Sequence, residues 1–104
     1  MARGQKAKTN GLLDRLPPQA VEVEQAVLGA MLIDGRAIVH ALGSLAAGDF
    51  YHTPHARIFT ALLDCHRYEG KADTLSVGDY LKGQDRLDES GGVVYLAELA
   101  SGVA

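Results

Sequence analysis

The sequence lacks the features of disulfide-bonded, secreted and membrane-spanning proteins. It has a single cysteine, Cys65, so no internal disulfide can form. No apolar signal-peptide core follows Met1, which predicts a cytoplasmic protein in a reducing compartment. The most apolar stretch, residues 21–33, is shorter than the run of about 20 residues that crosses a bilayer. We therefore expect no contact with a membrane.

Positive charge is also scarce once the N-terminal segment is left aside. Residues 1–16 hold four basic residues, and six basic residues against twelve acidic ones remain in residues 17–104. An acidic balance opposes binding to a phosphate backbone, which needs clustered Lys and Arg. We predict that residues 1–16 form a flexible basic tail and that residues 17–104 form one helical domain.

Motifs of nucleotide-binding and nucleophilic enzymes are missing. The sequence contains neither G-x-x-x-x-G-K-[ST], the P-loop signature, nor a G-x-S-x-G nucleophile elbow. Cys65 is predicted on the buried side of a helix, where a thiol is inert. His52, His55 and His66 come without the paired cysteine spacing of zinc sites, and His55 and His66 lie about 16 Å apart on one predicted helix. We expect no catalytic, cofactor-binding or metal-binding residues.

Apolar residues recur at helical spacing along most of the chain. This spacing predicts an all-α fold, a compact bundle of about five short helices around a central helix at residues 21–33. That helix is apolar nearly all round, so we expect other helices to enclose it. Ala20 is a poor N-cap for it, and Asp34-Gly35 is interpreted as its C-terminal stop, with Gly35 left-handed.

One strip of the central helix carries no large apolar side chain. It consists of Glu22, Gln25 and Gly29. A glycine in the middle of a helix costs about 1 kcal/mol relative to alanine, so Gly29 needs a reason. We favour close packing against another helix of the same chain over an exposed seam against a neighbouring subunit. Burial of Gly29 within one chain would decide between them.

Two helices are predicted in the middle of the chain. The first covers residues 36–45. The second begins with Thr53 as N-cap and Pro54 at the first helical position, and it ends at Gly70. Between them, the aromatic pair Phe50-Tyr51 is expected to anchor the connecting loop into the core.

Two shorter helices complete the prediction. Ser76-x-x-Asp79 resembles a capping box that opens one of them, and Ser90-Gly91-Gly92 forms a turn into the other. Asp88 and Glu89 oppose phosphate binding at that turn. The predicted structural core consists of Val27, Leu28, Met31, Phe50, Ile58, Phe59, Leu62, Leu81, Tyr95, Leu96 and Leu99.

Several segments, taken together, resemble one family. Residues 16–32 contain P-P, E-x-E-Q and V-L-G, as does the start of the N-terminal domain of bacterial replicative DNA helicases of the DnaB family. Further blocks follow in the family's order: Asp49-Phe50-Tyr51, His55-x-x-Ile58-Phe59, Asp73 leading to Leu81-Lys82, and Gly91-Gly92-x-x-Tyr95-Leu96-x-Glu98-Leu99. The resemblance covers roughly residues 16–102.

The resemblance implies the globular head of a helicase that works as a ring of six. Such a helicase encircles single-stranded DNA and unwinds the replication fork with ATP and magnesium. Its N-terminal domains form a collar that docks primase and, in some bacteria, a helicase loader. In the family a helical hairpin, a linker helix and an ATPase domain follow, and this sequence contains none of them. We therefore expect a non-catalytic piece that binds proteins, self-associates weakly or not at all, and has little or no direct affinity for DNA.

Two alternatives stay open. A small helical nucleic-acid-binding domain would use the basic residues of the N-terminal segment, and it would show an affinity for single-stranded DNA that depends steeply on salt. The related helical domain at the C-terminus of primase is disfavoured, because the P-P, V-L-G and G-G-x-x-Y-L blocks follow the helicase order.

Overall fold

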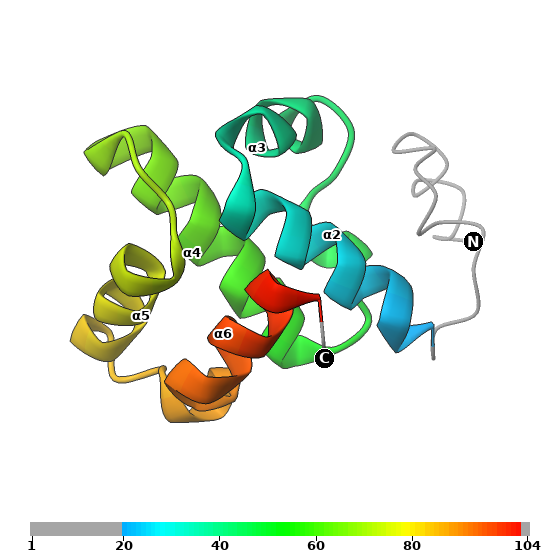
Figure 1. Cartoon of the computed structure of the whole chain (residues 1–104). Coiled ribbons are helices and arrows are strands. Elements are labelled where there is room, and N and C mark those ends of the chain that lie inside the picture. Colours follow the sequence, from blue (N-terminus) through cyan, green and yellow to red (C-terminus); the bar gives the residue numbers. More distant parts are fainter. Residues whose placement is uncertain (1–19, 103–104) are drawn as a thin grey trace.

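The central helix forms where the hydrophobic spacing places it. In the computed structural model, which describes residues 20–102, helix α2 runs across the middle of the molecule (Figure 1). The proposed tail at residues 1–16 lies outside the described residues. The helices are α2 (Val21–Ile33), α3 (Gly35–Leu42), α4 (Thr53–Glu69), α5 (Thr74–Gly83) and α6 (Gly92–Ser101), with 3₁₀ turns η2 (Ala47–Asp49) and η3 (Asp88–Ser90). Residues 20–102 contain no strand, so the predicted all-α bundle of five helices is confirmed.

The helices pack around α2 and α4. Helix α2 contacts α6, α4 and α3, while α5 packs against α4 and α6 (Figure 1). Most of the predicted core residues are buried where these helices meet: Leu28, Met31, Phe50, Ile58, Phe59, Leu62, Leu81, Leu96 and Leu99. Val27 and Tyr95 are half-buried at the edge of this core. No helix within residues 20–102 has the length and apolar character needed to cross a bilayer.

Helix α2 is not enclosed on every side, contrary to the prediction. Ala26 and Ala30 are exposed, and Ile33 retains 69% of its accessible surface. A single methyl group exposes little apolar area and is tolerated at a surface. One side of α2 therefore stays open to solvent.

The break between α2 and α3 also differs from the prediction. Gly35 is not left-handed; it is the first residue of α3. Asp34 has an extended backbone (φ −136°, ψ 115°), and its carboxylate accepts a hydrogen bond of 2.9 Å from the backbone N–H of Arg36. Asp34 is thus the N-cap of α3. Helix α3 ends at Leu42, before the predicted end at residue 45.

Helix α4 begins one residue earlier than predicted. Thr53 is its first helical residue rather than its N-cap, and His52 occupies the cap position without a side-chain cap bond. Pro54 lies in the first turn, where its missing N–H costs nothing. The helix ends at left-handed Gly70 (φ 70°), as predicted.

The capping box of α5 is formed by a different residue pair from the predicted one. The Asp73 carboxylate accepts from the backbone N–H of Ser76, and the Ser76 hydroxyl accepts from the backbone N–H of Asp73, both at 2.9 Å. Ser76 is therefore the second partner of the box and not its N-cap. The Asp79 carboxylate takes no part in it.

The aromatic pair before α4 divides between core and surface. The Phe50 ring is buried, with its centroid 4.9 Å from that of Phe59. Tyr51 is 63% exposed, so only one of the two rings anchors the loop.

Candidate interaction surface and buried polar cluster

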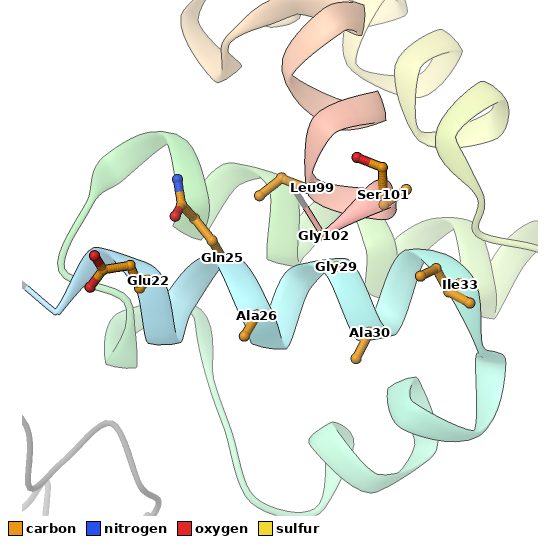
Figure 2. A pocket seen from close by; sticks show the side chains of 10 residues that line it. Glu22, Gln25, Ala26, Gly29, Ala30, Ile33, Leu99, Ser101 and Gly102 are labelled. Atoms are coloured by element: carbon orange, nitrogen blue, oxygen red, sulfur yellow. The ribbon is translucent and has the colours of Figure 1, made fainter. Parts of the chain in front are cut away.

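Helices α2 and α6 make their closest approach at Gly29. A Cβ atom at this position would clash with the carbonyl oxygen of Leu99 and lie 3.2 Å from its carbonyl carbon. Figure 2 shows Gly29 facing the end of α6. Only a residue without a side chain lets the two backbones come this close. Gly29 is buried by its own chain, so this part of the strip forms an internal helix contact.

A shallow groove of 450 Å³ follows α2 beside the end of α6. Glu22 and Ile33 mark its two ends along α2, and Ala26 and Ala30 lie between them (Figure 2). These four residues are exposed. Gln25 also lines the groove, but it is half-buried and turned toward α6. The exposed side of α2 therefore presents small apolar side chains over which another helix could lie closely.

The other side of α2 carries a buried carboxylate, which the hydrophobic spacing alone does not indicate. Glu24 is only 3% exposed. Its Oε2 accepts a 2.7 Å hydrogen bond from the backbone N–H of Tyr51, and its Oε1 lies 2.7 Å from Nδ1 of His55 and 3.1 Å from Nδ1 of His52. The backbone N–H of His52 is a longer donor at 3.4 Å. One glutamate of α2 thus holds the start of α4.

The cluster continues from α4 to α6. Nε2 of His55 lies 2.6 Å from the hydroxyl of Tyr95, and this hydroxyl accepts a 3.1 Å hydrogen bond from the side-chain amide of Gln25. A neutral His55 satisfies all of these partners, because Nδ1–H donates to Glu24 while Nε2 accepts from Tyr95. Tyr95 is half-buried because its hydroxyl reaches this chain of hydrogen bonds. We call Glu24, Gln25, His52, His55 and Tyr95 the polar cluster.

The two glycines before α6 position Tyr95. Gly91 and Gly92 have φ angles of 103° and 81°, which residues with a side chain rarely adopt. A Cβ at Gly91 would also lie 2.7 Å from Cδ2 of Tyr95. The glycine pair therefore forms the predicted turn and leaves room for the Tyr95 ring.

Electrostatics keep Glu24 charged. Burial by itself raises the pKa of the Glu24 carboxyl, but the hydrogen bonds from His55, Tyr51 and His52 outweigh burial and hold this pKa below its ordinary value. Glu24 is therefore ionised at neutral pH. A buried charge is costly unless it is paired, and these donors provide the pairing.

Cys65 is the opposite case, a buried group kept neutral. Burial, with the nearby charges of Glu69 and Asp64, raises the pKa of the Cys65 thiol to about 11. Its Sγ lies 3.6 Å from the carbonyl oxygen of Ser76. A thiol protonated at neutral pH is a poor nucleophile.

Segments far apart in the sequence meet in the polar cluster. Glu24 and Gln25 belong to E-x-E-Q, His55 to H-x-x-I-F and Tyr95 to G-G-x-x-Y-L, three of the blocks on which the family resemblance depends. His55 is buried in this cluster. His66 lies eleven residues further along α4 and is half-buried. The signal that could have found Glu24 was its position as a charged residue on the otherwise apolar side of α2.

Comparison with known proteins gives one consistent result. The family model of the DnaB-like helicase N-terminal domain matches residues 16–104. The replicative DNA helicase DnaB of Rhodothermus marinus is 46% identical over 90 residues, which cover 86% of this chain and 10% of that protein. The replicative DNA helicase DnaB of Geobacillus stearothermophilus is 43% identical over 90 residues, which cover 86% of this chain and 20% of that protein.

One solved structure is similar to this chain in both fold and sequence. The crystal structure of the N-terminal domain of DnaB helicase from Mycobacterium tuberculosis aligns with a TM-score of 0.79 and 38% identity, covering 86% of this chain and 62% of that one. The chain thus spans a tenth to a fifth of the length of the two helicases named above. With a family match over residues 16–104 and a matching solved fold, the chain belongs to the DnaB-like helicase N-terminal domain family.

Proposed function

We propose that this chain is the protein-interaction and ring-assembly domain of a replicative DNA helicase that unwinds DNA at the replication fork. The family match over residues 16–104 is the observation that carries this proposal. Because the sequence has no P-loop, the contribution of these residues is contact rather than ATP hydrolysis. In the whole helicase, ATP and magnesium would serve the motor domain.

The proposed partners are primase, the other subunits of a six-membered ring and, in some bacteria, a helicase loader. The exposed side of α2 supports contact as a mode of action. Ala26, Ala30 and Ile33 line the groove with apolar side chains. This composition is typical of the centre of a protein–protein interface, which is poorer in charged residues than its rim. Small side chains also let a partner helix approach closely.

A binding titration with the cognate primase tests the proposal. Residues 1–104 would be compared with the same chain extended through the helical hairpin of the family. We expect the extended chain to bind primase more tightly, and we expect Ala30→Gln to weaken binding by about tenfold, a loss of about 1.4 kcal/mol. The matched control is Ala97→Gln, at an exposed position of α6 that does not line the groove. Absence of primase binding by both chains would overturn the docking role.

Self-association provides a second test. We expect residues 1–104 to sediment mainly as a monomer at micromolar concentration, because the collar pairing of the family relies largely on the hairpin. A tight dimer at that concentration would contradict this expectation.

The competing function, nucleic-acid binding through the basic residues of the N-terminal segment, makes a different prediction. Fluorescence polarisation with labelled single-stranded DNA would then show binding that weakens steeply as salt is raised. We expect no such affinity, because residues 17–104 carry an excess of acidic groups.

A further inference from the structure

We propose that Glu24, His52 and His55 form a binding site for a divalent transition-metal ion, with zinc as the best fit. Oε1 of Glu24 and one ring nitrogen of each histidine lie within 4.8 Å of one another. Two imidazoles and one carboxylate form a donor set that suits zinc, nickel and cobalt. This proposal does not depend on the helicase role.

The spacing of the three donor atoms fits a metal ion with little movement. Oε1 of Glu24 lies 2.7 Å from Nδ1 of His55 and 3.1 Å from Nδ1 of His52. Two ligands at about 2.1 Å from a tetrahedral zinc ion are about 3.4 Å apart, so each ring nitrogen would move away from Oε1 by less than about 1 Å. The backbone N–H of Tyr51 holds Oε2, which leaves Oε1 directed toward the two rings.

The surroundings supply the second set of contacts that metal-binding histidines usually have. If Nδ1 of His55 binds the ion, the proton resides on Nε2, and the Tyr95 hydroxyl lies 2.6 Å away to accept it. The side-chain amide of Gln25 holds that hydroxyl in turn. Such outer partners fix the ring and its tautomer and contribute to metal affinity. Tyr95 is therefore a positioning residue of the proposed site.

The site is reachable and lies in an acidic environment. The side chain of His52 is 34% exposed. A groove of 490 Å³ adjoins the site, lined by His52, His55 and Tyr95 and by the acidic residues Asp88, Glu89 and Glu98. Glu89 is paired with Arg57 at 3.1 Å, and the carboxylates of Asp88 and Glu98 add negative charge along the groove, which raises the local concentration of cations. The groove also gives water access to the positions on the ion that the protein does not occupy.

Titration of the full chain with zinc tests the proposal. Isothermal titration calorimetry should show one equivalent of Zn²⁺ bound, and Co²⁺ should give the visible absorption of a protein-bound ion. His52→Gln removes one ligand at a half-exposed position and should weaken binding by at least about tenfold, while Tyr95→Phe should weaken it by about tenfold through its effect on His55. His40→Gln and His66→Gln are the matched controls and should leave binding unchanged.

Folding is monitored separately, because the same atoms also form hydrogen bonds without a metal. Circular dichroism should show that the His52→Gln variant stays helical, and zinc should raise the unfolding temperature of the unaltered chain but not that of this variant. Two outcomes would overturn the proposal. One is the absence of stoichiometric zinc binding by the unaltered chain, and the other is binding that His52→Gln leaves intact.

Discussion

Helix α2 has an inward side, which packs against α4 and α6, and an outward side, which faces solvent. The two sides differ in how much their residues depend on contacts with other helices. On the inward side, Glu24 is 3% exposed and hydrogen-bonded to the start of α4, and Gly29 admits the backbone of α6. On the outward side, Ala26, Ala30 and Ile33 face solvent. A glycine in mid-helix destabilises an isolated helix, and a carboxylate is costly to bury unless it is paired. Tertiary contacts therefore account for both residues on the inward side. Because these outward residues are exposed, we expect them to contribute little to folding.

The largest expected effect comes from removing the charge of Glu24. Glu24→Gln places an amide NH₂ among N–H donors, so buried donors lose their acceptor. We expect a loss of about 3 kcal/mol in the free energy of unfolding, measured by urea denaturation. The control is Glu22→Gln at an exposed position of the same helix, which should change stability by less than about 0.5 kcal/mol. If both substitutions lowered the free energy of unfolding equally, the inward and outward sides of α2 would not differ in their contribution to stability.

Filling the contact at Gly29 should have the next largest effect. Gly29→Ala forces α2 and α6 apart, because the added methyl group meets the backbone of Leu99 rather than a movable side chain. We expect a loss of about 2 kcal/mol, measured by thermal and urea unfolding. Gly35→Ala is the control, since a Cβ at Gly35 meets nothing within 4 Å. A Gly29→Ala variant as stable as the Gly35→Ala variant would show that the helices do not touch at this point.

Tyr95→Phe should have a smaller effect. It keeps the ring and removes only the hydroxyl that links His55 to Gln25. We expect a loss of about 1 kcal/mol, typical of one hydrogen bond. A double-mutant cycle with Gln25→Ala should show coupling, because both variants break the same bond. Strict additivity would mean that Gln25 and Tyr95 do not interact in solution.

Changes on the outward side should leave stability nearly unchanged. Ala30→Gln is expected to change the free energy of unfolding by less than about 0.5 kcal/mol, because Ala30 is exposed and supports no buried contact. Differential scanning calorimetry measures this directly. A large destabilisation would show that the outward side contributes to the fold and would remove the basis for treating it as a partner surface.

Local signals in the sequence were sufficient for most of the fold. The end of α4 at Gly70 and the turn at Gly91 and Gly92 were predictable, because only glycine readily adopts the backbone angles that these positions need. Gly35 was assigned to the end of α2 because glycine commonly ends a helix, although it begins α3. The start of α5 was misplaced because Ser76, which follows Asp73, also resembles an N-cap. The exposed position of Ala30 does not follow from its residue type, since alanine is common in both the core and the surface of helical proteins.

The candidate sites were less predictable from the sequence. Helical spacing identified the strip with Glu22, Gln25 and Gly29, but it could not tell which of them would be buried. Glu24 was treated as an isolated polar residue. Its ring partners His52 and His55 are 28 and 31 positions away in the sequence, and no local pattern connects them to Glu24.

The sequence by itself determined the helical class, the location of the central helix and the membership in the family, because each depends on spacing and residue type along the chain. Only the tertiary structure decided that Gly29 meets Leu99 and that Glu24, His52, His55 and Tyr95 form one cluster. The physical reason is that such contacts depend on how helices cross and on which side each presents, and side-chain spacing within one helix does not set either.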